Sequence, residues 1–426
     1  MRLILVDRTE ELRANFYPLT LNRPVWELRC GIRSLGERLI SRLGIADVAC
    51  LVPDYMAETY RAGAGQPVND LKSLSGDDLL ILDGRLKTEE IEFALDGPSR
   101  VHLDAQGHIL YARISRADAG NLQHGSIDEF LRSLTAWVPT ETCSPAKWNY
   151  TWDLILANAE HIASDFAKIG RSGIEGTIEE PCAIRGSRKD IYIAPGAVLH
   201  PMVVIDAENG PVYVDEGVQI HPFSRIEGPC YIGKGTTVLG AKCRAGNSIG
   251  PACRIGGEVE ESIIQGYSNK YHDGFLGHAY VGEWVNLGAQ TTNSDLKNDY
   301  SSVSVMLDGR RSIDTGSPKV GSLIGDHTKT SIGTLFNTGS YVGAMAIIMA
   351  TGKPLPKFIP SFAWFIEGVV TKGFGKGKLY ETAKTVVGRR GRQWSEADEA
   401  MWDAILEMTA PARDEAIKKG RRAMAR

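Results

Sequence analysis

Apolar residues recur at every sixth position through most of the chain after residue 170. From Val214 to Val238 the series runs unbroken over five residues. A period of six fits neither an α-helix, with about 3.6 residues per turn, nor a plain strand, whose side chains alternate with a period of about two. It is typical of a parallel β-helix built from hexapeptides. The series comprises Ile193, Leu199, Ile205, Val214, Ile220, Ile226, Ile232, Val238, Ile249, Ile255, Val281, Leu287, Ile324, Phe336, Val342 and Ile348.

Glycine often follows the aliphatic residue, as in YIGKG, SIGPA and YVGEW, and glycine suits tight corners that strain other residues. A β-sandwich with regular turns is the alternative, but five consecutive apolar residues at six-residue spacing argue against it. We predict a β-helix over 171–365, with a polar loop leaving it at 291–321 and a proline-rich end at 353–364. Such a prism has flat faces that favour packing against symmetric copies, so we expect a homotrimer.

The first 143 residues have a different pattern, with short apolar runs separated by polar segments. Strand-like runs lie at 3–6, 48–52 and 78–84, and 25–44 has apolar residues at helical spacing. This alternation predicts an α/β domain with a parallel sheet over 1–143. A linker helix is predicted over 144–170.

The last segment, 366–426, is predicted to be a helical tail. Ser395 and Asp398 have the spacing of a capping box. The basic end of this tail is expected to be a solvated helix face.

The composition narrows the class of protein. The chain has 426 residues, a net charge of −4 and seven cysteines with no CxxC pair. The charge gives no electrostatic case for nucleic acid or anionic lipid as main partner, and the cysteines indicate reduced thiols. The start, MRLILVDRTEELR, does not have the pattern of a signal peptide. No apolar stretch reaches the roughly 18 residues of a membrane span. We expect a soluble cytoplasmic protein.

One segment resembles a known family. Residues 256–290, GGEVEESIIQGYSNKYHDGFLGHAYVGEWVNLGAQ, followed by NSDLKN, are similar to the acetyltransferase β-helix of the bifunctional glucosamine-1-phosphate N-acetyltransferase/N-acetylglucosamine-1-phosphate uridylyltransferase (GlmU) family. RPVWELRCGI, GDHTKTSIGTLFNTGSYVG and FIPSFAW match an alternative bacterial branch of that family. The resemblance spans most of 1–365. It implies a nucleotidyltransferase-like α/β domain, a linking helix and a trimeric left-handed β-helix.

The resemblance also implies a reaction and its residues. In the family an amine attacks the thioester of acetyl-CoA while a histidine removes the amine proton, and His272 stands at that position. Imidazole suits the task because its pKa lies near working pH. Asn286 matches a substrate-contacting asparagine. Ala289 matches an alanine whose main chain contacts the coenzyme or the thioester oxygen, where a backbone N–H stabilises negative charge.

Two departures from the better-known branch concern the acceptor. Glu260 replaces a lysine, and Phe275 replaces a substrate-binding tyrosine. A sugar phosphate still needs cations. We assign that role to four basic residues of the same coils, namely Lys270, Arg254, Arg244 and Lys242.

Other histidines allow a different hypothesis, because some hexapeptide β-helices bind zinc through three histidines. His200, His221 and His327 are the candidates, but the chain has no HxxxxH pair, so we do not predict zinc. His278 is interpreted as a structural residue or a partner of the site.

The N-terminal domain lacks the glycine-rich loop that usually follows the first strand of a nucleotidyltransferase, since no glycine precedes Gly31. Either Arg8, Arg13, Arg23 and Arg29 bind the phosphates of UTP by side chain, or they are surface residues. The resemblance implies Mg²⁺ at this domain, with Asp83 as its ligand.

Three hypotheses follow. The first is an acetyl-CoA-dependent N-acetyltransferase acting on an amino-sugar phosphate, glucosamine 1-phosphate, with uridylyl transfer from UTP as a second activity that yields UDP-N-acetylglucosamine. The second is an acyltransferase acting on a nucleotide-linked amino sugar. The third is a non-catalytic trimeric scaffold. We favour the first.

Overall fold

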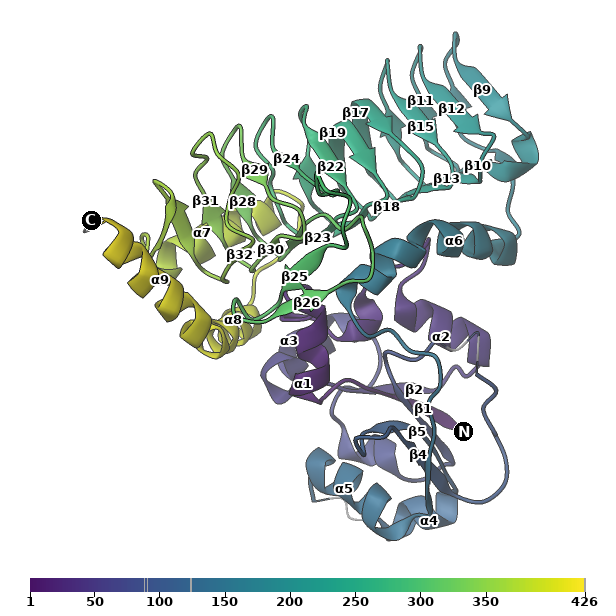
Figure 1. The fold of residues 1–426 in the computed structure, drawn as a ribbon. Coiled ribbons are helices and arrows are strands. Elements are labelled where there is room, and N and C mark those ends of the chain that lie inside the picture. Colours follow the sequence, from purple (N-terminus) through teal and green to yellow (C-terminus); the bar gives the residue numbers. More distant parts are fainter. Residues whose placement is uncertain (88, 90, 123–124, 425–426) are drawn as a thin grey trace.

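The computed structural model describes residues 1–426 except 88, 90, 123–124 and 425–426. An N-terminal α/β domain lies against one side of an elongated β-helix, and helices cover the far end of that β-helix (Figure 1). The predicted fold class, an α/β domain followed by a left-handed parallel β-helix and C-terminal helices, is therefore confirmed. No helix of the described residues is both long and apolar enough to cross a membrane.

The N-terminal domain is built on a six-stranded sheet of order β2-β1-β3-β5-β4-β6. Strands β1, β2 and β3 are parallel, and β5 runs antiparallel to β3. The strands are β1 Arg2–Val6, β2 Val48–Leu51, β3 Leu79–Asp83, β4 Arg100–Leu103, β5 Ile109–Ile114 and β6 Thr140–Thr142. The helices are α1 Glu10–Arg13, α2 Leu35–Leu43, α3 Asp54–Ala64, α4 Arg116–Asn121 and α5 Ile127–Trp137.

The continuous helix predicted for 25–44 is wrong. A 3₁₀ turn at Val25–Glu27 is followed by an irregular segment, and only Leu35–Leu43 is α-helical. Ser34 begins this helix with a capping box that Glu37 closes, and Gly44 ends it in the left-handed conformation. The capping box, and not the apolar spacing that starts at Val25, therefore determines where α2 begins.

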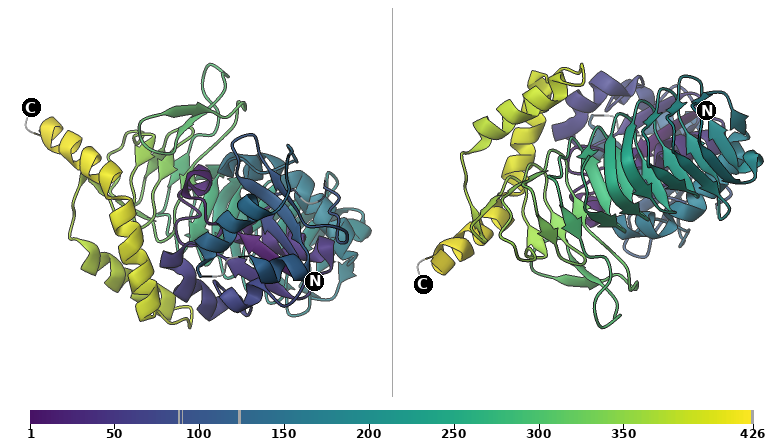
Figure 2. Two further views of the ribbon diagram at one scale, coloured as in Figure 1. Left: turned by 90° about the horizontal axis from the view of Figure 1, so that it is seen from below. Right: turned by 90° about the horizontal axis from the view of Figure 1, so that it is seen from above.

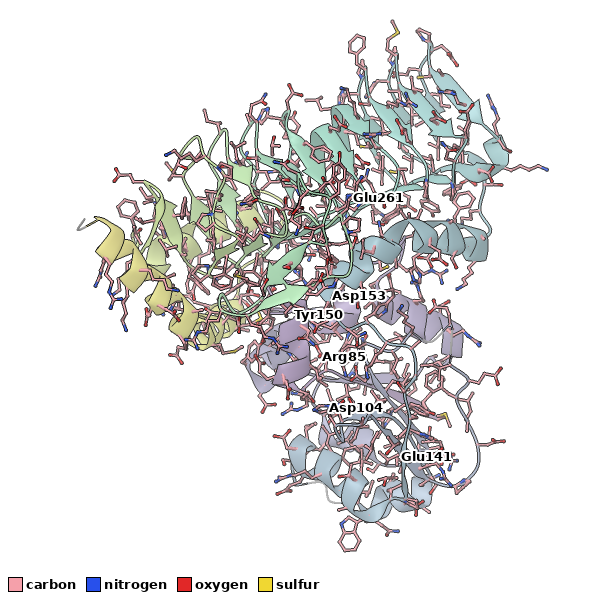
Figure 3. The ribbon with its side chains drawn as sticks, in the orientation of Figure 1. Arg85, Asp104, Glu141, Tyr150, Asp153 and Glu261 are labelled. Atoms are coloured by element: carbon pink, nitrogen blue, oxygen red, sulfur yellow. The ribbon has the colours of Figure 1, made fainter. Side chains whose placement is uncertain are left out.

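Helix α6, Thr151–Ile169, joins the N-terminal domain to the β-helix. It begins at Thr151, later than the predicted start at residue 144. The carboxylate of Asp153 accepts from the N–H of Tyr150 at 3.0 Å, which fixes the first turn between the two domains (Figure 3).

The β-helix stacks its coils through three parallel ladders. The first contains β7 Gly173–Ile174, β10 Ile191–Ile193, β13 Val212–Val214, β16 Cys230–Ile232, β18 Asn247–Ile249, β20 Ile263–Gly266, β23 Tyr280–Glu283, β27 Leu323–Ile324, β30 Tyr341–Val342 and β32 Phe358–Ile359. The second contains β8 Thr177–Ile178, β11 Val198–Leu199, β14 Gln219–Ile220, the starts of β17 Thr237–Cys243 and β19 Arg254–Glu260, then β21 Asn269–Lys270, β28 Lys329–Thr330, β31 Ile347–Ile348 and β33 Trp364–Ile366, which pairs with β34 Val369–Thr371. The third contains β9 Ala183–Gly186, β12 Val204–Ala207, β15 Arg225–Glu227, the ends of β17 and β19, β22 Phe275–Gly277, β24 Thr292–Asn293 and β29 Leu335–Phe336.

The residues of the sixfold series form the inside of the prism. All of them are buried in one hydrophobic cluster. Each coil therefore contributes inward-facing aliphatic side chains at six-residue steps, as the hexapeptide pattern predicts.

The segment predicted as a loop at 291–321 contains regular structure. It starts with β24 and includes an antiparallel hairpin, β25 Ser304–Met306 with β26 Ser312–Asp314. Val303 and Val305 of this hairpin join the core that the N-terminal domain shares with the β-helix. The alternation of serine and valine in SSVSV agrees with a strand that has one buried face.

Polar contacts also lock the two domains together. The Arg23 guanidinium donates to both carboxylate oxygens of Asp326 and lies 3.1 Å from Glu283. The Asn158 amide of α6 donates to the carbonyl of Gly246 at 2.8 Å.

The tail consists of α7 Lys376–Gly388, α8 Glu396–Met408 and α9 Ala410–Met424. The predicted Ser395–Asp398 capping box is present. Helix α8 packs against α3 of the N-terminal domain, whereas α9 packs against β34 at the end of the β-helix, and its C-terminal end points outward (Figure 2). The tail thus contacts both domains.

Candidate active site and a second cavity

A cavity of about 690 Å³ lies beside the corner between β21 and β22. The coils of the β-helix form most of its wall, and the end of α7 closes one side. His272, Asn286, Ala289 and Arg254, all of them candidates from the sequence, line this cavity together.

His272 lies on the corner that joins β21 to β22, and it is exposed. Its ring meets the Tyr271 ring edge-on at 5.2 Å, and its imidazole has no hydrogen bond to any other residue that the structure describes. Gly274 permits the tight corner, since its φ is +124° and a Cβ there would meet the Thr291 carbonyl oxygen at 2.2 Å. The corner thus presents an imidazole with both nitrogens available.

Lys270 lies beneath this corner and is buried. Its ammonium donates to the carbonyl of His272 at 2.6 Å and to that of Gly256 at 2.9 Å. Burial lowers the pKa of Lys270 to about 8. The side chain therefore supports the His272 backbone and does not line the cavity, which corrects its assignment as a phosphate ligand.

Asn286 and Ala289 both lie on the next coil of the β-helix. The Asn286 side-chain oxygen accepts from the Asn269 amide at 3.2 Å. The carbonyl of Ala289 accepts from Gly333 at 2.8 Å, whereas no described residue accepts from the Ala289 N–H. This N–H is a free backbone donor in the cavity wall.

Four basic side chains line the cavity. Arg254 lies over the Tyr271 ring at 5.9 Å. Arg389 and Arg390 come from the C-terminal end of α7, and Arg390 donates to Asn269 at 3.0 Å. Lys329 donates to the carbonyls of Trp284 and His327 at 2.6 and 3.0 Å. The cavity is therefore basic and suits an anionic ligand.

The other two candidate cations lie elsewhere. Arg244 forms ion pairs with Glu258 at 3.5 Å and Glu260 at 3.2 Å. Lys242 pairs across the third ladder with Arg225 and Glu258. Neither lines the cavity, because this ladder faces a different side of the prism.

Sequence reasoning missed several lining residues. Tyr267 and Trp284 stack with ring centroids 4.5 Å apart. Val386, Arg389 and Arg390 belong to the tail, where VVGRRGR is the only signal. A basic cluster at a helix end suggests an anion site, but the sequence does not say which coil it meets.

The remaining histidines do not form a metal site. His278 is buried and its Nδ1 lies 2.8 Å from the Asp295 carboxylate, a structural contact outside the cavity. His200 and His221 stack at 4.7 Å, while His327 lies among Trp284, Trp394 and Trp402. Among the described residues, no group of three histidine, cysteine or acidic side chains is placed to hold a metal.

A second cavity, of about 260 Å³, lies at the carboxyl ends of β1 and β3. Ligands of open α/β sheets bind at such strand ends. Arg8 and Asp83 line it, together with Asp7, Arg85, His108 and Arg132.

The other candidate arginines of this domain do not reach the second cavity. Arg13 is buried, paired with the Asp7 carboxylate and bonded to the Thr20 carbonyl. Arg23 holds the domain interface. Arg29 stacks over the Tyr231 ring at 5.3 Å. These three side chains are structural, which corrects their assignment to UTP phosphates.

The residues of the second cavity do not fit Mg²⁺. Arg85 occupies both oxygens of Asp83, with Nε at 3.0 and 3.2 Å and Nη2 at 2.6 Å. Asp7 is held by Arg13 and by the Val25 N–H at 2.8 Å. Magnesium needs carboxylate oxygens that are free to coordinate.

Residues 3–172 match a family model described as sugar nucleotidyl transferase. The bifunctional protein GlmU of Jannaschia sp. (strain CCS1) is 33% identical over 142 residues, which are 33% of this chain and 30% of that protein. A bifunctional sugar-1-phosphate nucleotidylyltransferase/acetyltransferase of Sulfurisphaera tokodaii is 35% identical over 112 residues, 26% of each chain. A solved UDP-N-acetylglucosamine acyltransferase shares 16% identity, with a TM-score of 0.25 over 58% of this chain and 95% of that one.

The chain thus spans less than a third of the length of these two curated relatives. Residues 3–172 are therefore similar to sugar nucleotidyl transferases, and up to 33% of the chain is similar to bifunctional proteins such as GlmU.

Proposed function

We propose that this protein transfers the acetyl group of acetyl-CoA to the amine of an amino-sugar phosphate, glucosamine 1-phosphate, in the cavity beside His272. The observation that carries the proposal is one cavity that combines an exposed imidazole, a free backbone N–H and several cations.

The chemistry is a direct transfer. The amine nitrogen attacks the thioester carbonyl, the C–N bond forms, and His272 takes the amine proton. The Ala289 N–H stabilises the oxyanion of the tetrahedral intermediate. The C–S bond then breaks, coenzyme A leaves as a thiolate and takes up a proton, and the products are the N-acetylated sugar phosphate and free coenzyme A.

The cations determine the class of acceptor. Arg254, Arg389 and Arg390 offer guanidinium groups, whose planar donors match phosphate oxygens. Asn286 offers an amide for a sugar hydroxyl or for the acetyl group. An unphosphorylated amino sugar would bring no anion to these guanidinium groups, so we favour a phosphorylated acceptor over an unphosphorylated one.

We also propose that the active assembly is a homotrimer. Met202, Phe223 and Ile332 are exposed apolar residues on corners between the second and third ladders, and exposed Met349 directly follows β31 of the second ladder. His272 also lies on a corner between the second and third ladders. Solvent-facing apolar side chains along one edge favour a protein contact. Light scattering tests this, since three copies of the 46.5 kDa chain are expected in one particle and a monomer mass would contradict it.

Release of coenzyme A from acetyl-CoA, with glucosamine 1-phosphate as acceptor, tests the activity. Release by wild type that His272→Ala abolishes, and that the control His200→Ala leaves intact, supports the proposal. Release only with a nucleotide-linked amino sugar would favour the second hypothesis. No release across a panel of amino sugars would favour the scaffold.

The match of residues 3–172 to the sugar nucleotidyl transferase model favours uridylyl transfer as a second candidate function. It predicts UDP-N-acetylglucosamine from UTP and N-acetylglucosamine 1-phosphate. The side chains of the second cavity argue for a different role.

A further inference from the structure

The second cavity has the location of a nucleotide site but a different set of charges. Its two carboxylates, Asp7 and Asp83, are each neutralised by an arginine of the same domain. Arg85 binds Asp83 through its backbone N–H as well, at 2.8 Å. These contacts leave no acidic oxygen of the cavity without a cationic partner nearby.

The reason is local in the chain. Directly after β1 the segment DRTEELR forms the short helix α1, which places Arg13 against Asp7. A glycine-rich loop would present backbone N–H groups there instead. Arg85 follows Asp83 by two residues and turns back onto it, near the start of α6 (Figure 3).

Three cationic or polar donors remain for a ligand. Arg132 is exposed, and its only side-chain bond among the described residues is from Nε to the Asp128 carbonyl at 3.1 Å. Among the described residues, none bonds to Arg85 Nη1 or to His108 Nε2, while His108 Nδ1 contacts Asp104. Arg8 contributes less, since Asp54 and Asp128 pair with its guanidinium.

The cavity is also small. Its volume of about 260 Å³ lies below the ~300–1,000 Å³ range of pockets for drug-sized ligands. This favours a ligand no larger than a sugar monophosphate over a nucleoside triphosphate with its metal.

We propose that the N-terminal cavity binds a sugar monophosphate through arginine and histidine side chains without a divalent cation, and that this domain does not transfer nucleotidyl groups. The domain then acts as a binding module for the phosphorylated sugar. The inference concerns a site separate from the acetyl-transfer cavity and does not rest on acetyl transfer.

The test titrates N-acetylglucosamine 1-phosphate into the full-length protein by calorimetry, with EDTA and then with excess Mg²⁺. Three variants accompany wild type: Arg132→Gln, Asp83→Asn and the control Arg116→Gln, an exposed arginine of the same domain that does not line the cavity. All of them keep the β-helix cavity intact, so a difference in binding belongs to the N-terminal cavity. Coenzyme A release, measured in parallel, is expected to stay unchanged in every variant, so failure of acetyl transfer is recognised separately.

We expect binding in EDTA that Mg²⁺ does not change. Arg132→Gln should weaken it about 10-fold because a charge-assisted contact is lost, while Arg116→Gln leaves it unchanged. Asp83→Asn should keep or strengthen binding, because it releases the Arg85 charge, whereas a magnesium ligand at Asp83 predicts the opposite. Binding that requires Mg²⁺, equal affinity of Arg132→Gln and wild type, or Mg²⁺-dependent formation of UDP-N-acetylglucosamine from UTP would each overturn the inference.

Discussion

The ammonium of Lys270 donates to the main-chain carbonyl of His272 over 2.6 Å. A second bond, to the Gly256 carbonyl on the preceding coil, anchors the same ammonium at 2.9 Å. The corner that carries the proposed base is therefore tied to the coil beneath it by one buried side chain. Catalytic geometry depends on such support, because a displacement of about 1 Å costs up to about 100-fold in rate.

Lys270→Met tests this support. Without the ammonium, two carbonyls lose their donor and the corner relaxes, so we expect kcat for acetyl transfer to fall about 10- to 100-fold. KM should change little, since Lys270 does not line the cavity. Steady-state kinetics with acetyl-CoA and glucosamine 1-phosphate measure both constants. Lys242→Met, an exposed lysine of the third ladder, serves as control, and a variant whose KM rises while kcat holds would instead mark Lys270 as a substrate ligand.

Arg390→Gln tests the contribution of the tail. Arg390 donates to Asn269 at 3.0 Å, and Asn269 in turn donates to Asn286. Loss of the guanidinium removes one phosphate donor and breaks this series of hydrogen bonds. We therefore expect KM for the phosphorylated substrate to rise about 10-fold. The increase should shrink at high salt, where wild-type binding is itself screened. Arg422→Gln, which changes an exposed arginine near the end of α9, is expected to behave like wild type. Equal KM values for both variants would remove Arg390 from the site.

The β-helix was predictable because its inward positions depend on a local period. Ile220 and Ile226 take their place from the six-residue step alone, and both are fully buried. The cations of the cavity were not predictable in this way. Arg244 and Arg254 are ten residues apart on neighbouring coils, yet one faces Glu258 and Glu260 while the other lines the cavity.

The contacts of the C-terminal tail were even harder to predict from the sequence. Arg390 meets Asn269 across 121 residues of sequence, and that contact depends on how α7 and α8 pack onto both domains. Caps also outweigh periodicity at short range, as Ser34 does when it starts α2 nine residues after the apolar pattern begins. The six-residue repeat carries no information about long-range packing or about the residues that cap helices.

The stability of the protein should depend on pH through Lys329. Burial lowers the pKa of Lys329 to about 7, below its ordinary value of 10.5. The unfolded chain therefore holds this proton between about pH 7 and 10.5 while the folded protein releases it, and the penalty for the buried charge fades as pH rises. Relative to Lys329→Met, wild type should gain up to about 1.4 kcal/mol per pH unit in its free energy of unfolding.

Urea unfolding of both proteins at about pH 7 and about pH 9 measures this difference. The comparison with Lys329→Met cancels the titration of tyrosines and cysteines, which the variant leaves in place. If the free energy of unfolding of wild type minus that of Lys329→Met stays constant or falls as pH rises, Lys329 keeps its proton in the folded state.

The domain interface offers the last test. Arg23 and Asp326 are both buried, and the Arg23 guanidinium contacts both oxygens of that carboxylate. Asp326 also accepts from the Asn22 amide at 3.0 Å. Asp326→Ala leaves the buried guanidinium with Glu283, at 3.1 Å, and the Leu19 carbonyl, at 3.4 Å. One of its two carboxylate partners is lost, so we expect a loss of about 3–5 kcal/mol in the free energy of unfolding.

The double variant Arg23→Met/Asp326→Leu separates the pair from its surroundings. Replacing both charges by apolar side chains removes the unpaired charge, and such replacements of buried pairs are often neutral or stabilising. We therefore expect the double variant to recover most of the stability that Asp326→Ala loses, as measured by urea unfolding. If the double variant is as unstable as Asp326→Ala, the ion pair itself holds the N-terminal domain to the β-helix, and apolar packing between Tyr280, Ile263 and the N-terminal core is not sufficient to do so.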